Sequence, residues 1–163
     1  MIMMLKKIKT KFFSFMERLD RKRIIYDRLD NEPYLERYYV FLKDRKLFPF
    51  NIFLHRFLKS DPDHVHDHPW PYATLILKGG YYEWIPQFNS LGEKIGEIRM
   101  WRGPGHFRVC KSTSYHRIEV CEGVECWTLF MPGPQKREWG FLVDNKWMEN
   151  GKYFNYRKSA LRQ

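Results

Sequence analysis

The stretch His66-Asp67-His68-Pro69-Trp70 places two histidines one residue apart. In an extended segment alternate side chains project to the same side, about 7 Å apart along the chain, so two such imidazoles can reach one metal ion. Pro69 favours an extended conformation for the residue before it, which preserves this arrangement at His68. The stretch therefore predicts two ligands of a metal site near the start of a strand.

A third histidine, His116, opens a later segment in which apolar residues alternate with polar ones. If His116 faces inward, Ile118 and Val120 also face the core. Three imidazoles that meet inside a β-barrel leave coordination positions open for water or substrate. We therefore expect His66, His68 and His116 to bind one divalent metal ion.

Other interpretations of the histidines stay open at this point. A bare H-x-H occurs often by accident, and these residues could be solvated loop histidines among Asp61, Asp63 and Asp67. His64 offers an alternative pair with His66. His55 alternates with phenylalanines in a strand-like run, so it is expected to be either a buried, hydrogen-bonded histidine or a residue that orients a ligand, and not a ligand itself.

From Arg37 onward, short runs typical of strands alternate with Gly, Pro, Asn and Asp. The strands are predicted at 37–43, 51–58, 72–78, 80–85, 96–101, 106–110, 116–121, 125–131 and 137–143. Without an intervening helix of about ten residues, this series indicates an all-β antiparallel sandwich or barrel. Gly79-Gly80 and Glu122-Gly123 are the clearest hairpin turns.

Residues 2–20 have the periodicity of an amphipathic helix, whose apolar stripe is Leu5, Ile8, Phe12, Phe15 and Leu19. The stripe favours docking on the barrel or on an oligomer partner. A cationic helix with a Phe-rich face also has the chemistry to bind an acidic membrane or a nucleic acid. The last dozen residues are expected to form a short helix or a frayed tail.

The net charge of +10 is concentrated at the two ends of the chain. Residues 1–23 carry eight basic and two acidic side chains, whereas residues 47–146 carry twelve basic and eleven acidic ones. The barrel itself is therefore not expected to bind nucleic acid. We divide the chain into a basic helix and connector (1–32), a barrel (33–146) and a basic tail (147–163).

The three cysteines are an odd number without a C-x-x-C pair, which argues against a disulfide framework and for a reducing compartment. The apolar start of the chain is shorter than a signal-peptide core or a spanning helix. With a length of 163 residues, the chain fits one domain that is expected to be cytoplasmic.

The spacing of His66, His68 and Gly79 resembles the first motif of the cupin superfamily, and His116 fits the histidine of the second motif. This resemblance implies an RmlC-like jelly-roll barrel that holds a metal. The glutamate of the first motif is replaced by Tyr72 or Ala73, so a three-histidine site, as in the cysteine-dioxygenase branch, is the closer comparison.

More narrowly, residues 33–143 resemble a family of uncharacterised cupin-like proteins of bacteria and phages. The resemblance rests on Tyr34-Leu35-x-Arg37-Tyr38, Leu54-His55-Arg56-Phe57, His66-Asp67-His68-Pro69-Trp70, Gly79-Gly80-Tyr81, His116-Arg117-Ile118-Glu119, Trp127-Thr128-Leu129 and Trp139-Gly140-Phe141. It supports the fold and the metal more than the reaction, and it implies a homodimer only because cupins commonly dimerise.

Four further residues are predicted to bind substrate. Trp70 and Tyr72 share the parity of His68 and should face the same cavity, where Tyr72 could act in catalysis. Arg56 and Arg108 lie in mostly apolar strands, where a cation normally requires an acidic partner. Each either binds a substrate carboxylate or phosphate, with Arg108 the catalytic candidate, or forms an internal salt bridge, for instance to Glu119.

Glu83 is the most plausible carboxylate to replace the missing ligand, and a solvated hairpin glutamate is the alternative. The combined prediction is a three-histidine enzyme of the non-haem Fe(II) oxygenase type, with zinc, manganese or nickel as alternative metals. An uncompensated +2 charge favours a small anionic substrate. The rival hypotheses are a non-catalytic module that binds a sugar, nucleotide or other small ligand, and an interaction protein recruited by its basic helix.

Overall fold

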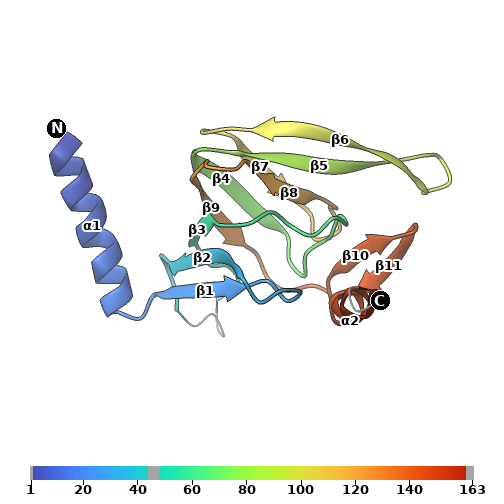
Figure 1. The fold of residues 1–163 in the computed structure, drawn as a ribbon, viewed down its shortest axis with the longest axis horizontal. Coiled ribbons are helices and arrows are strands. Elements are labelled where there is room, and N and C mark those ends of the chain that lie inside the picture. The colour runs from blue at the N-terminus through green and yellow to red at the C-terminus, as the bar shows by residue number, and fades with distance from the viewer. Residues whose placement is uncertain (1, 44–47, 161–163) are drawn as a thin grey trace.

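The computed structural model describes residues 2–43 and 48–160, except for the side chains of residues 2–6, 8 and 9. Strands dominate, and a helix lies near each end of the chain (Figure 1). The elements are α1 (Ile2–Arg18), β1 (Lys22–Tyr26), β2 (Pro33–Tyr39), β3 (Phe53–Phe57), β4 (Tyr72–Lys78), β5 (Tyr81–Phe88), β6 (Lys94–Arg102), β7 (Phe107–Cys110), β8 (Arg117–Val120), β9 (Cys126–Pro132), β10 (Gly140–Val143), β11 (Lys146–Glu149) and α2 (Asn150–Ala160).

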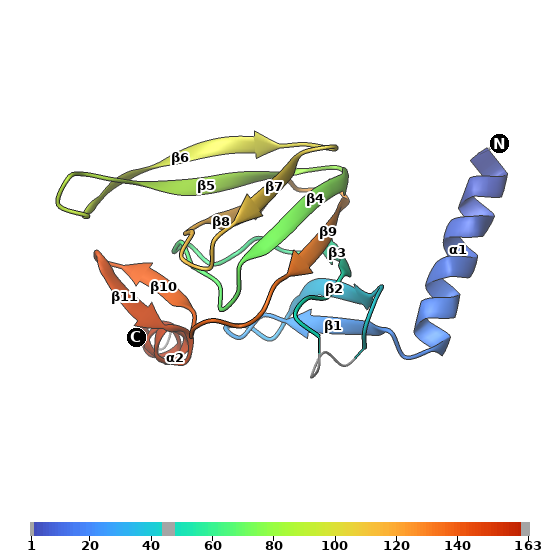
Figure 2. The same ribbon diagram turned by 180° about the vertical axis from the view of Figure 1, so that it is seen from behind.

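The described strands pair in antiparallel fashion within three sheets, which confirms the predicted all-β antiparallel class but does not give one closed hydrogen-bonded barrel. The six-stranded sheet has the order β1-β2-β3-β9-β4-β7, and the three-stranded sheet has the order β6-β5-β8. A buried apolar cluster of Ile76, Tyr81, Ile118 and Cys126 joins the two sheets. The β10–β11 hairpin and α2 lie at one end, opposite α1 (Figure 2).

Each predicted strand corresponds to one of β2–β10, but β1 and β11 were not predicted. They lie in segments 22–26 and 146–149, expected to be a connector and the start of a tail. Both strands are short, and β1 is a partly exposed edge strand, so neither shows a clear alternation. Asp144 and Asn145 form the β10–β11 turn with positive φ angles of 47° and 60°. Asp and Asn are favoured at such turn positions, so the sequence does carry a signal for this hairpin.

Gly79-Gly80 and Glu122-Gly123 are not hairpin turns, contrary to the prediction. The first joins β4 to β5 and the second joins β8 to β9, and in each case the two strands belong to different sheets. Both segments are corners at which the chain passes from one sheet to the other. Local sequence could not reveal this, because it does not specify which strands pair.

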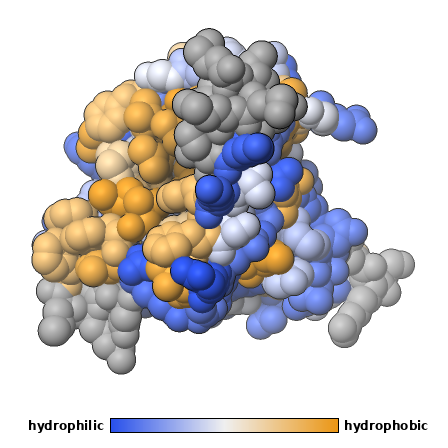
Figure 3. Space-filling model, turned by 90° about the vertical axis from the view of Figure 1, so that its left-hand side faces the viewer, coloured by the Kyte–Doolittle hydropathy of each residue, from blue (hydrophilic) through white to orange (hydrophobic). Residues whose placement is uncertain are grey.

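Helix α1 docks on the outer face of the six-stranded sheet, as one interpretation predicted, but through other residues. Met16 and Phe13 pack against Tyr38 and Trp127. Of the predicted stripe, three residues are exposed by 40 to 50 %: Phe12, Phe15 and Leu19. Figure 3 views this end of the molecule and shows apolar side chains gathered on its surface.

The side chains of the other two predicted stripe residues, Leu5 and Ile8, lie outside the described set. Helix α2 agrees with the expected short C-terminal helix, and residues 161–163 lie outside the described ones. Within the described part of the chain, neither helix has the length and apolar content needed to cross a membrane.

The corner at Gly79 provides a test of the fold. Gly79 has φ +69°, and a Cβ there would collide with the backbone carbonyl of Glu125. Gly105, with φ +85°, has open space around it. We expect Gly105→Ala to lower the free energy of unfolding by about 1 kcal/mol through backbone strain alone. Gly79→Ala should lower it by about 3 kcal/mol, since overpacking adds to the strain.

Urea unfolding of both variants measures the difference. Equal losses for Gly79→Ala and Gly105→Ala would contradict the close approach of the corner to β9.

Candidate metal centre

The backbone of residues 65–67 is held between two strands. His66 N–H donates to the carbonyl of His116 at 2.8 Å, and His116 N–H donates to the carbonyl of His66 at 3.0 Å. On the other side, Asp67 N–H donates to the carbonyl of Gly140 at 3.0 Å. Two of the three predicted ligands are thus a directly hydrogen-bonded antiparallel pair, and this fixes their relative position.

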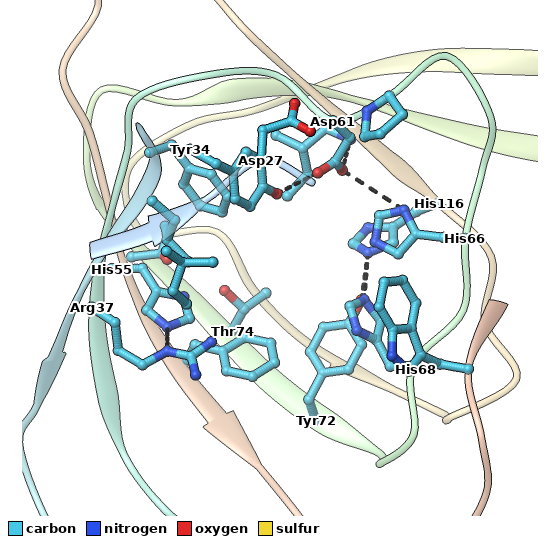
Figure 4. Close-up of a pocket in the computed structure, with 18 of the residues that line it drawn as sticks. Asp27, Tyr34, Arg37, His55, Asp61, His66, His68, Tyr72, Thr74 and His116 are labelled. Atoms are coloured by element: carbon cyan, nitrogen blue, oxygen red, sulfur yellow. Dashed lines mark hydrogen bonds and ion pairs between the residues drawn. The ribbon is translucent and has the colours of Figure 1, made fainter. Parts of the chain in front are cut away.

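The three predicted ligands meet at one point. His66, His68 and His116 can each offer a nitrogen such that all three nitrogens lie within 4.8 Å of one another. The Nε2 atoms of His68 and His116 are 2.9 Å apart (Figure 4). Two nitrogens bound at right angles, each about 2.1 Å from one ion, would lie about 3 Å apart. The cluster therefore has the dimensions of a site for one metal ion.

Burial keeps His66 and His68 in the neutral form that binds a metal. His66 and His116 are exposed by only 8 % and 5 %. Desolvation lowers the pKa of His66 to about 4 and lowers the pKa of His68 well below its usual value. Both residues are therefore uncharged at neutral pH.

Glu83 lies behind His116, on the side away from the cluster. Its Oε1 is 2.8 Å from His116 Nδ1, and its Oε2 accepts a hydrogen bond from Arg102 Nε at 2.9 Å and forms an ion pair with Arg108. Burial raises the pKa of Glu83, but His116, Arg108 and Arg102 outweigh it and lower the pKa to about 2. The ionised carboxylate accepts a hydrogen bond from His116 Nδ1–H, which orients the ring so that its Nε2 points toward the cluster.

The two interpretations offered for Glu83 are therefore both wrong. Its carboxylate is neither part of the nitrogen cluster nor solvated, since the residue is only 1 % exposed. In the antiparallel pairing of β5 with β8, Glu83 lies opposite Ile118, two residues after His116. The pairing of these strands is a long-range contact, so the local sequence around Glu83 gave no signal of it.

His66 also has a carboxylate nearby. Its Nδ1 lies 4.0 Å from Asp61 Oδ2 and makes no hydrogen bond with a described residue. Asp61 accepts hydrogen bonds from the hydroxyl of Tyr34 and from the backbone N–H of Ile118, at 2.6 Å for the latter. The sequence indicates only a loop around Asp61, because nothing local connects this residue to the later strand.

A cavity of about 300 Å³ extends from the three histidines between the two large sheets. Trp70 and Tyr72 line it, as their parity predicted, and the Tyr72 hydroxyl lies 3.3 Å from His116 Nε2. Aromatic side chains supply much of the wall, and Figure 4 shows Arg37 and His55 across the cavity from the histidines.

The two predicted substrate arginines are placed differently. Arg108 lies across from Thr74 in the β4–β7 pair and pairs with Glu83, not with Glu119. Its guanidinium forms an ion pair with the Glu83 carboxylate that contacts His116, so Arg108 helps to position His116 through Glu83.

Arg56 lies outside the cavity, contrary to the prediction. Its strand neighbours His55 and Phe57 line the cavity, so alternation turns Arg56 to the other face of the sheet. There it forms ion pairs with Glu36 and Glu125, each at 3.4 Å.

The remaining histidine predictions agree with the structure. His64 Nδ1 lies 3.1 Å from the hydroxyl of Tyr153, and the residue is not part of the cluster. His55 is 4 % exposed and hydrogen-bonds to Arg37, so it is a buried, bonded histidine.

Comparisons with known proteins identify the fold. No family model and no curated protein matches the sequence. The polyketide cyclase RemF from Streptomyces resistomycificus is 13 % identical with a TM-score of 0.52, covering 77 % of this chain and 82 % of its own. Rru_A2000 from Rhodospirillum rubrum, a cupin-2 domain, is 10 % identical with a TM-score of 0.53, covering 83 % and 81 %.

A third similar structure is FeII HppE in complex with substrate, which is 11 % identical with a TM-score of 0.50. The match covers 69 % of this chain and 57 % of that one. Cupin-domain proteins are thus the structural neighbours of the chain, which has the cupin fold.

The buried network around Glu83 makes a direct prediction. Glu83→Ala leaves Arg102 and Arg108 without their common carboxylate, so we expect the free energy of unfolding to fall by about 3 kcal/mol or more. As a matched control, Glu119→Ala removes a partly exposed carboxylate that pairs with Arg99, which should cost at most about 1 kcal/mol.

Urea unfolding at pH 7 with a chelator present measures both losses without a contribution from metal. A Glu83→Ala loss no larger than that of Glu119→Ala would contradict the network.

Proposed function

We propose that this chain is a metal-dependent enzyme in which His66, His68 and His116 hold one divalent transition metal, with Fe(II) favoured, and that it acts on a small anionic molecule. The observation that carries the proposal is the cluster of three nitrogens at one end of a buried cavity. The orientation of His116 by Glu83 supports it, because ligating histidines commonly donate their other N–H to a carboxylate.

The donor set fits this class of metal. Three imidazole ligands suit iron, zinc, nickel or copper better than the oxygen-preferring magnesium and calcium. A ligand set that leaves coordination positions open is typical of catalytic sites, whereas structural sites are closed. FeII is the metal named for HppE, which shares the fold, and this supports the choice of iron over zinc, manganese or nickel. When bound, such an ion supplies Lewis-acid or redox chemistry.

The residues around the cluster have separate tasks in this proposal. Glu83 and its two arginines hold the His116 ring and its tautomer. Burial raises the pKa of Tyr72 well above its usual value, so its hydroxyl stays protonated and can donate a hydrogen bond to an anionic ligand. The aromatic wall of the cavity, which includes Trp139 and Phe141, excludes water from this ligand.

Metal analysis tests the proposal. Anaerobically purified protein should contain about one transition-metal ion per chain, and His66→Ala should lower the content at least tenfold because it removes one of three ligands. His64→Ala is the matched control, two residues away but hydrogen-bonded to Tyr153 outside the cluster, and should retain the metal. Equal metal content in the two variants would contradict the assignment.

Removal of the metal should also lower stability. A ligand present at a hundred times its dissociation constant stabilises the folded state by about 2.7 kcal/mol. A chelator should therefore lower the free energy of unfolding by about the same amount. The proposal would be overturned if the purified protein held no transition metal and a chelator left its free energy of unfolding unchanged. Oxygen consumption with candidate anions then separates the enzyme from a module that binds its ligand without turnover.

A further inference from the structure

Arg37 lies on the inner face of the six-stranded sheet, far from the metal ligands in sequence. It pairs with His55, which pairs with Thr128, which in turn pairs with Ile76, so the four residues form one row across β2, β3, β9 and β4. Arg37 and His55 both line the cavity. Figure 4 shows Arg37 across the cavity from His66, His68 and His116, so a ligand in the cavity can face those histidines with one end and Arg37 with the other.

The guanidinium of Arg37 is held in a fixed orientation. Its Nε donates a hydrogen bond to His55 Nε2 at 3.0 Å, and its central carbon lies 4.6 Å from the centroid of the Phe53 ring. The His55 ring itself stacks against both Phe53 and Phe130, with centroid distances of 5.8 and 5.2 Å. Burial and the charge of Arg37 lower the pKa of His55 well below its usual value, so His55 stays a neutral acceptor.

Among the described residues, no carboxylate lies within ion-pair distance of Arg37. The two acidic groups of the cavity are already engaged, since Asp27 pairs with Lys59 at 3.1 Å and Asp61 binds Tyr34. Arg28, the other arginine of the cavity, donates to the Asn150 side chain at 2.7 Å. A largely buried cation without an anion is costly, and proteins normally pair it.

We propose that Arg37, positioned by His55, binds a carboxylate of the ligand that occupies this cavity. The terminal nitrogens of a guanidinium form a planar fork that matches a carboxylate with two parallel hydrogen bonds. One fixed guanidinium balances a single negative charge, which favours a carboxylate over a dianionic phosphate. This inference rests on the proposed function for the other end of the ligand, since it specifies a carboxylic acid whose second group faces the metal.

Binding of benzoate, measured by calorimetry on the full chain, tests the subsite. Benzoate carries one carboxylate on an aromatic ring that suits the aromatic walls. Arg37→Gln should weaken benzoate binding at least tenfold, and Arg37→Lys should restore part of it. Arg56→Gln is the matched control, because Arg56 faces the outer side of the neighbouring strand, and should leave the affinity unchanged. Benzyl alcohol, the neutral analogue, should bind all four proteins equally.

Three results would overturn the subsite: no saturable benzoate binding to the wild type, equal affinity of Arg37→Gln and wild type, or tighter binding of phenyl phosphate than of benzoate. Thermal unfolding of Arg37→Gln and Arg37→Lys confirms that both are folded. The metal content of each variant is measured beside the affinity. If benzoate binding depends on Arg37 but neither the wild type nor the variants hold metal, the subsite stands and the proposed function fails. If the protein holds metal but its benzoate affinity does not depend on Arg37, the proposed function stands and the subsite fails.

Discussion

The site depends on one pair of backbone hydrogen bonds, those exchanged between His66 and His116. These bonds attach the H-x-H segment to the start of β8, and the contact of Asp67 with Gly140 attaches its other edge to β10. Because these bonds fix the backbone, the His66 and His116 rings lie next to each other, with centroids 5.1 Å apart. For the metal site proposed above, side chains that the backbone already holds close together lower the entropic cost of binding.

The sequence predicted the parts of the site that local alternation controls. His66 and His68, together with Trp70 and Tyr72, follow from a period of two and from Pro69, and the structure places all four around the cavity. Alternation does not, however, specify which face of a strand is buried when both faces carry aromatic and charged residues. The sequence accordingly indicated Arg56, which lies on the outer face, and gave no sign of Arg37, which lines the cavity from the neighbouring strand.

What the sequence could not provide was the pairing between distant strands. The register of β5 with β8 turns Glu83 from a hairpin residue into the buried acceptor for His116. In the same way, the assignment of β4 and β5 to different sheets makes Gly79-Gly80 a corner. Each correction concerns a contact over more than thirty residues, for which a single sequence carries no local signal.

The residue between the two histidines belongs to a different part of the molecule. Asp67 is fully buried, and its carboxylate accepts hydrogen bonds from Gly140 N–H at 2.7 Å and Trp147 Nε1 at 3.1 Å and pairs with Arg137 at 2.9 Å. Within one short segment, His66 and His68 thus belong to the histidine cluster, whereas Asp67 holds the C-terminal hairpin. A protein engineer could not transplant the histidine pair into another scaffold by itself, because its spacing residue is also the anchor of that hairpin.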